Sequence, residues 1–152
     1  MGAITATSRA ALISIQPRYA FAILDERKTV EFRKRPLAED VSLAWIYATA
    51  PIQRVVGYFT IGRIVADSPE DLWDQYGQVG CIDKLDFDAY YRGSRLGYAI
   101  EVDDVRSLAE APPLNVVFPS VVPPQSFRYV APHHHALHRT VRIQRDHRPV
   151  LT

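Results

Sequence analysis

The order of four or five short β-rich runs constrains the fold most, because helix-like patterns follow only the first and the fourth of them. These runs span residues 11–15, 29–35, 43–49, 54–65 and 96–102. A sheet of purely parallel strands would need a helix after each strand, and the sequence does not supply one. We therefore predict an α+β fold, a small mixed β-barrel with one early helix and two short helices inserted before the last core strand.

The three predicted helices have recognisable starts or ends. The first covers residues 17–25, where Pro17 occupies a first-turn position that does not need its missing N–H. The second begins at Ser68, whose hydroxyl is suited to cap a helix that has proline in its first turn. The third covers residues 87–91 and ends at Gly93. In the long run 54–65, Gly57 and Gly62 predict bulges or sharp bends.

The chain beyond Asp103 changes in composition and predicts a different organisation. Five prolines within residues 112–124 break regular structure, which favours an extended strap packed on the barrel. We predict three parts: a disordered leader at residues 1–10, a barrel with its C-terminal strap at residues 11–130, and a basic tail rich in His and Arg at residues 131–152.

Several classes of protein are excluded by simple counts over the 152 residues. No apolar run approaches the roughly 18 residues of a membrane span, and the N-terminus does not resemble a secretory signal, so we expect a cytoplasmic protein without a membrane partner. A single cysteine, Cys81, excludes an internal disulfide and a zinc knuckle. The tail histidines His133–His135 and His138 lack a cysteine or carboxylate nearby, and we predict no metal site and no cofactor.

Arginine usage points toward nucleic acid in spite of a formal net charge of only +1. The chain has 15 Arg against 3 Lys, and arginine makes planar, bidentate contacts with phosphates and base edges. The cations are also segregated. Residues 9–35 hold seven of them against three acids, and residues 128–152 hold five against Asp146, whereas residues 36–88 carry nine acids against three bases.

The segment from Arg18 to Arg35 holds the most informative group of charges. Strict alternation over residues 29–35 places Glu31 and Arg33 on one face, close to Lys28 at the end of the preceding turn. Cations there could donate to phosphate or carbonyl oxygens, and the glutamate could accept from an exocyclic amine. The same alternation also fits a solvated face of a half-buried strand without any ligand.

The same residues resemble a known family. Residues 12–20, 23–24 and 27–33 resemble the opening of the ASCH family, which belongs to the PUA-like β-barrel superfamily. Residues 46–51, 55–57, 72–73, 97–100 and 123–129 resemble a branch of ASCH proteins described as predicted transcriptional regulators. The resemblance covers about residues 11–130. It departs from the family where the usual turn glycine is replaced by Asp25 or Glu26.

The resemblance implies a cleft for RNA, or for a single modified nucleotide or nucleoside, beside Lys28. Our first hypothesis is a non-enzymatic module that binds RNA or a modified nucleotide there, with DNA as another candidate partner and with a regulatory role. The candidate binding residues are Arg18, Tyr19, Lys28, Glu31, Arg33, Gln125, Ser126 and Arg128.

Two alternatives remain. Some ASCH proteins are amidohydrolases of acetylated cytidine or ribonucleases, so Lys28 and Glu31 could be catalytic in a small hydrolase of a modified nucleoside or RNA. The amidohydrolase type has a threonine three residues after the lysine, whereas this chain has Glu31. The second alternative is a regulatory adaptor that binds a protein or DNA through its basic tail.

Overall fold

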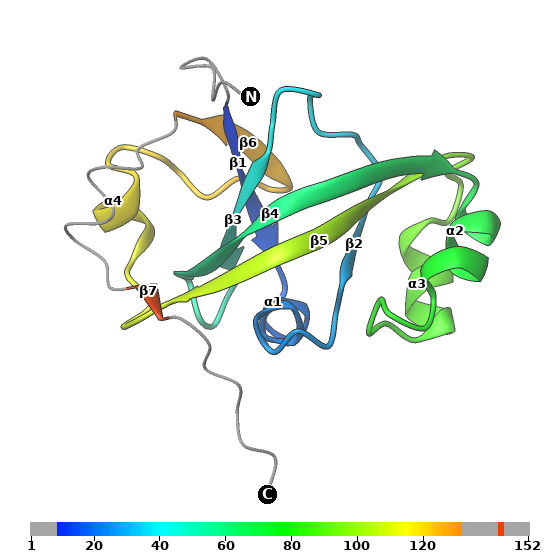
Figure 1. The fold of residues 1–152 in the computed structure, drawn as a ribbon, viewed down its shortest axis with the longest axis horizontal. Coiled ribbons are helices and arrows are strands. Elements are labelled where there is room, and N and C mark those ends of the chain that lie inside the picture. Colours follow the sequence, from blue (N-terminus) through cyan, green and yellow to red (C-terminus); the bar gives the residue numbers. More distant parts are fainter. Residues whose placement is uncertain (1–8, 132–142, 145–152) are drawn as a thin grey trace, which may run out of the picture.

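One curled sheet organises the molecule, and the computed structural model describes it over residues 9–131 and 143–144. Its strands lie in the order β2-β5-β4-β3-β1-β6, and β7 pairs with β5 off this path (Figure 1). The strands are β1 (Ala10–Ile15), β2 (Val30–Arg33), β3 (Leu43–Ala48), β4 (Arg54–Asp67), β5 (Gly97–Leu108), β6 (Phe127–Val130) and β7 (Ile143–Gln144). The predicted α+β fold is confirmed, in the form of a half-barrel.

Four short helices accompany the sheet within the described residues. They are α1 (Pro17–Leu24), α2 (Pro69–Tyr76), α3 (Lys84–Tyr90) and α4 (Leu114–Val117). Two predicted helix starts are confirmed, because Pro17 opens α1 and the Ser68 hydroxyl accepts from the Asp71 N–H at 3.1 Å. None of the helices in the described ranges is long and apolar enough to cross a membrane.

The curl of the sheet comes from its two long strands, β4 and β5, which run diagonally across the molecule (Figure 1). Beside Gly57, β4 has an extra residue against β3, because Ile46 pairs with Gly57 while Tyr47 pairs with Val55. The pairing of β4 with β5 shifts again on either side of Ile61, next to Gly62. Both predicted irregularities are thus present, and bulges of this kind bend and twist a sheet.

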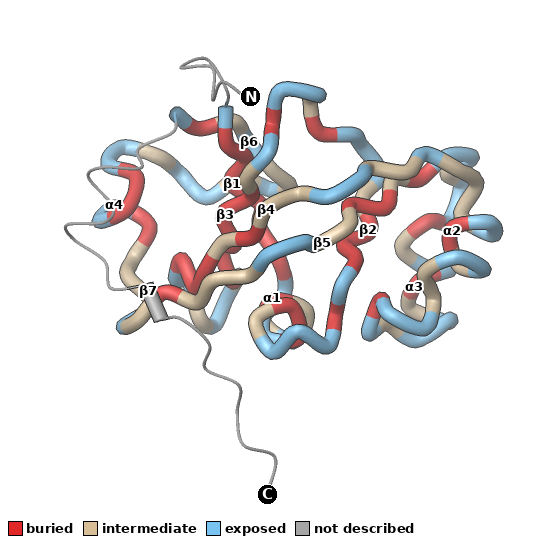
Figure 2. The backbone as a smooth tube through the Cα atoms, in the orientation of Figure 1, coloured by how far each residue is buried: buried red, intermediate tan, exposed pale blue. Residues whose placement is uncertain are grey.

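Three apolar clusters cover the sheet. The largest lies inside the curl under α1 and includes Ile13, Ile46 and Phe59, all fully buried. A second lies under α4, and a third, centred on Phe32 and Phe87, fixes α2 and α3. In Figure 2 the buried backbone follows β1 and β3 through the middle, while the outer sides of α2 and α3 are exposed. The inserted helices therefore form a separate flank beside β2.

Three features differ from the sequence-based expectation. Strand β5 continues past Asp103 to Leu108, because Val105–Ser107 still pair with β4 residues 57–59. Helix α3 begins at Lys84 rather than at residue 87. The proline-rich segment contains the unexpected α4, whose Leu114 and Val117 are buried in the second cluster. For α4, burial against distant strands outweighs local composition, and for β5, pairing with β4 does so.

The close approach of β4 to its neighbours yields the first prediction. A Cβ at Gly57 would collide with the backbone carbonyl oxygen of Arg106 and would lie 2.6 Å from Leu24 Cδ2, whereas at Gly62 the nearest atom is Glu101 Cβ at 3.2 Å. Gly57→Ala should therefore lower the free energy of unfolding by about 1–3 kcal/mol. Gly62→Ala is the matched control and should change it by about 0.5 kcal/mol or less. Urea unfolding followed by circular dichroism measures both, and equal losses would contradict this packing.

Candidate functional site

A cleft of about 940 Å³ opens between α1, the end of β2, the α3 flank and the segment that leads into β6. Residues 14–16 and 18–19 form one side, residues 31–35 form the floor and one end, and residues 125–127 lie opposite. Ile82, Asp86 and Tyr90 add a wall from the inserted helices. The cleft is thus built from segments far apart in the chain.

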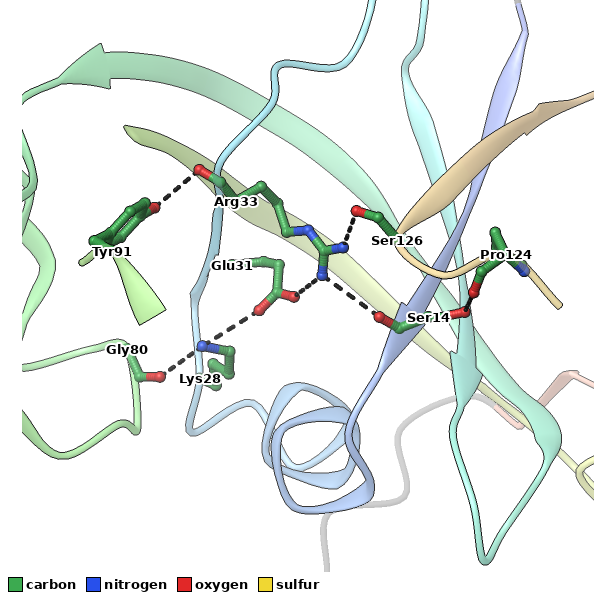
Figure 3. Close-up of polar contacts among 8 residues, drawn as sticks. All are labelled: Ser14, Lys28, Glu31, Arg33, Gly80, Tyr91, Pro124 and Ser126. Atoms are coloured by element: carbon green, nitrogen blue, oxygen red, sulfur yellow. Dashed lines mark hydrogen bonds and ion pairs between the residues drawn. The ribbon is translucent and has the colours of Figure 1, made fainter. Parts of the chain in front are cut away.

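A buried charge network forms the floor of this cleft (Figure 3). Lys28 is 2% exposed and Glu31 is 6% exposed. The Lys28 ammonium donates to the Gly80 carbonyl oxygen at 2.6 Å and lies 3.5 Å from Glu31 Oε1. Arg33 Nη1 lies 3.2 Å from Glu31 Oε2. One carboxylate is thereby shared by two cations, which compensates charges that would be costly to bury alone.

Local structure explains why these three side chains converge. In β2 the alternation places Val30 and Phe32 in the third apolar cluster and turns Glu31 and Arg33 to the other face, as predicted. Lys28 precedes this strand and is fixed by its backbone N–H, which donates to the Ala22 carbonyl oxygen at 3.0 Å. The turn after α1 uses Glu26 in the left-handed region at φ 61°, the conformation that glycine adopts most readily.

Arg33 also joins the two edges of the sheet across the cleft. Its Nη2 donates to the Ser126 hydroxyl, and its Nη1 donates to the Ser14 carbonyl oxygen at 3.4 Å. Ser14 in turn donates from its hydroxyl to the Pro124 carbonyl oxygen at 2.6 Å. These bonds hold the edge strand β2 against β1 and the segment before β6, as Figure 3 shows.

Two tyrosines place aromatic rings in the cleft. Tyr19 lies between cations, with Arg18 Cζ 4.5 Å and Lys28 Nζ 5.2 Å from its ring centroid. Lys34 Nζ lies 4.8 Å from the centroid of the Tyr90 ring. Burial raises the pKa of both phenols, so both rings stay uncharged at neutral pH and do not repel an anion. Such rings can stack on bases.

The cleft carries excess positive charge. Five of its lining residues are basic and two, Glu31 and Asp86, are acidic. Asp86 on α3 pairs with Arg18 at 3.5 Å across the mouth. Lys34 and Arg35 are exposed, and within residues 9–131 neither has a carboxylate partner.

The structure brings seven of the eight predicted binding residues to the cleft, all except Arg128. Arg128 is exposed on β6 opposite Leu12, two residues beyond Ser126. That spacing moves it about 7 Å along the strand, away from the cleft.

The cleft also contains residues that the sequence analysis did not select. Lys34 and Arg35 follow the motif directly, and the alternation over residues 29–35 puts Arg35 on the same face as Arg33, so a signal existed for it. Ile82, Asp86 and Tyr90 come from the insertion, and nothing in their local sequence connects them to the cleft.

Among the described residues no group of three or more His, Cys, Asp or Glu could hold a metal ion. The histidines at 133–135 and 138, like most of the basic tail, lie outside the described residues.

Comparison with known proteins finds ASCH proteins both by sequence and by structure. No family model matches the chain. Over 126 residues it is 32% identical to an ASCH domain-containing ribonuclease of Zymomonas mobilis subsp. mobilis, a match that covers 79% of this chain and 83% of that protein. A crystal structure of ASCH from Zymomonas mobilis superposes with a TM-score of 0.79 at 29% identity, covering 88% of this chain and 96% of that one. The chain is also 30% identical over 95 residues to the large ribosomal subunit protein uL22 of Ureaplasma parvum serovar 3, of which it covers only 30%.

The buried network generates the second prediction. Lys28→Met removes the ammonium while keeping most of the side-chain volume, and it leaves the Gly80 carbonyl oxygen and part of the Glu31 charge uncompensated. Breaking a buried pair in this way should lower the free energy of unfolding by about 3–5 kcal/mol.

The matched control is Lys84→Met, because Lys84 also pairs with a carboxylate, that of Asp88, but its side chain is 52% exposed. This change should cost about 0.5 kcal/mol or less. Chemical denaturation of both variants compares the losses. A Lys28 variant as stable as the Lys84 variant would show that the network does not hold the cleft together.

Proposed function

Because the chain belongs to the ASCH domain family, we propose that it binds RNA, and that an unpaired stretch of the RNA enters the cleft beside residues 28–33. One observation carries this proposal: a single cleft combines excess positive charge with two uncharged aromatic rings. A groove of this composition is the usual way to bind a single strand, with cations on phosphates and rings stacked on bases. The name of the relative that is 32% identical, a ribonuclease, supports RNA as the partner.

The size of the cleft favours unpaired nucleotides over a duplex. At about 940 Å³ it lies near the upper end of the range for small-molecule sites, so it can take individual bases but not a double helix. Sequence-specific recognition of RNA is directed mainly at such unstacked bases.

The residues divide into two groups by exposure. Lys34 and Arg35 are exposed at the mouth and are suited to phosphates, whereas Glu31 and Arg33 are largely enclosed at the floor. There, with Gln125 and Ser126 on the opposite side, they offer acceptors and donors to a base edge. The regulatory role that the resemblance implies is a further prediction, and binding does not depend on it.

The ring of Tyr19 provides the third prediction. Tyr19→Leu keeps an apolar side chain on α1 but removes the stacking surface, which should weaken binding of a single-stranded RNA by about 1–3 kcal/mol. Phe21→Leu is the matched control, because Phe21 is an exposed aromatic residue on the same helix and does not line the cleft. Fluorescence anisotropy with labelled RNA measures both affinities. Equal affinities for the two folded variants would argue against stacking on Tyr19.

RNA cleavage is a second candidate function. It is favoured by the ribonuclease relative together with the two cations, Lys28 and Arg33, that flank Glu31 in the cleft. In such a reaction the 2′-oxygen attacks the adjacent phosphorus, the bond to the 5′-oxygen breaks, and a proton passes from the 2′-hydroxyl to the departing 5′-oxygen. Lys28 and Arg33 would stabilise the charge that develops on the phosphoryl oxygens, and Glu31 would hold them in place.

The fourth prediction separates cleavage from binding. An oligoribonucleotide incubated with the protein in EDTA should yield a fragment ending in a 2′,3′-cyclic phosphate, and DNA of the same sequence should stay intact because it lacks the 2′-hydroxyl. Glu31→Gln, checked by its melting transition to be folded, should slow cleavage roughly 100-fold or more. Intact RNA that is nevertheless bound would eliminate this second function and leave the first.

A further inference from the structure

Surface cations differ in whether a carboxylate neutralises them. Of the fourteen Lys and Arg residues in the described part of the chain, eight form ion pairs at 4.0 Å or less. The six without an ion pair among the described residues are Lys34, Arg35, Arg54, Arg92, Arg95 and Arg128. All six are exposed, so each can take an anion without giving up a carboxylate within that part of the chain.

Four of these six lie together at one end of the cleft. In the β2–β5 pair Arg33 lies opposite Tyr98, in antiparallel register. Lys34 and Arg35 directly follow Arg33, and Arg95 precedes Tyr98 by three residues. Because the two strands are antiparallel, the chain leaves β2 and enters β5 at the same end of their ladder, which brings these cations to one end of the sheet.

The turn that contains Arg92 is fastened to the same place. The Tyr91 hydroxyl donates to the Arg33 carbonyl oxygen at 2.9 Å, and the ring of Tyr90 contacts Lys34. The Ser94 N–H donates to the Tyr91 carbonyl oxygen at 2.8 Å, with Gly93 at φ 79° permitting the tight turn. Arg92 and Arg95 thus flank a turn that is held against the end of β2.

The protein surface on the other side of this turn is acidic. A hollow of about 540 Å³ between α2 and α3 is lined by Glu70, Asp74 and Asp88, and Lys84 is the only cation among the described residues that line it. Like charges repel, so this hollow disfavours a polyanion, whereas the four cations without an ion pair favour one.

We propose that Lys34, Arg35, Arg92 and Arg95 form a basic rim that binds the phosphates of an RNA strand beyond the cleft. The strand then runs from the Tyr19 and Tyr90 rings across the end of β2 to the turn before β5. This proposal rests on the proposed function, because it takes the cleft as the place where the strand begins. Contacts of this kind position a strand and add affinity without reading its bases.

The test removes the far half of the rim. The double variant Arg92→Ala/Arg95→Ala is compared with a control double variant, Arg54→Ala/Arg106→Ala. The control removes the same formal charge, but at the ends of β4 and β5 that lie away from the rim. Both variants and the unmodified protein are titrated with single-stranded RNAs of about 4 and about 16 nucleotides, since site sizes in comparable grooves span that range. Each titration is repeated over a range of salt concentrations.

The rim variant should bind the short RNA like the unmodified protein and should bind the long RNA more weakly. Losing two phosphate contacts should reduce the slope of log K against log salt concentration by about 1.4. If both proteins bind equally at 1 M salt, the rim variant then binds the long RNA roughly 25-fold more weakly than the unmodified protein at 0.1 M salt. The control variant should retain the slope of the unmodified protein for both RNAs.

Three other outcomes separate the hypotheses. If the unmodified protein binds both RNAs but the rim variant has an unchanged slope with the long one, the rim is overturned and the cleft remains. If the unmodified protein binds neither RNA, the proposed function itself fails. A similar loss in the control variant would mean that net charge, and not the rim, attracts the strand, and it would also overturn the rim.

Discussion

The carboxylate of Glu31 between Lys28 and Arg33 is the interaction on which the rest of the site depends. A half-barrel leaves two unpaired edges, and Arg33 joins them through Ser126 and the Ser14 carbonyl oxygen. Arg33 can do so because Glu31 compensates its charge at 3.2 Å within the fold. On the other side, Lys28 ties the same carboxylate to the inserted helices at Gly80. One buried anion therefore holds three walls of the cleft.

The positive charges of the cleft have two separate tasks. Lys28 and Arg33 are enclosed and paired, so their charge serves mainly the architecture. Lys34 and Arg35, which follow immediately, are exposed and have no ion pair within the described residues, so their charge is available to a ligand. The change occurs where β2 ends, because past Arg33 the backbone leaves the sheet and its side chains reach solvent. Stability and ligand affinity can therefore vary independently at neighbouring positions.

Local patterns were sufficient to predict the motif, but not the walls around it. The period of two in β2 correctly separated Val30 and Phe32 from Glu31 and Arg33, since alternation is a property of a single strand. The contribution of α3 depends on a distant contact, Phe32 against Phe87 with ring centroids 4.9 Å apart, which no local pattern encodes. Arg128 was predicted together with Gln125 and Ser126 as part of one strap, whereas the pairing of β6 with β1 carries it away from the cleft. Helix α4 lies in a proline-rich segment, and its position likewise depends on burial against β4 and β1, which the local sequence does not indicate.

The insertion between β4 and β5 forms one wall of the cleft without belonging to the half-barrel. It meets the cleft floor and the end of β2 through the Gly80 carbonyl oxygen and the Tyr91 hydroxyl, and its helices pack on β2 and β5 through the third apolar cluster, which is separate from the cluster inside the curl. This wall consequently does not share the apolar core inside the curl of the sheet. Longer, shorter or differently charged helices at this point would change the shape and charge of the cleft while the sheet stays constant.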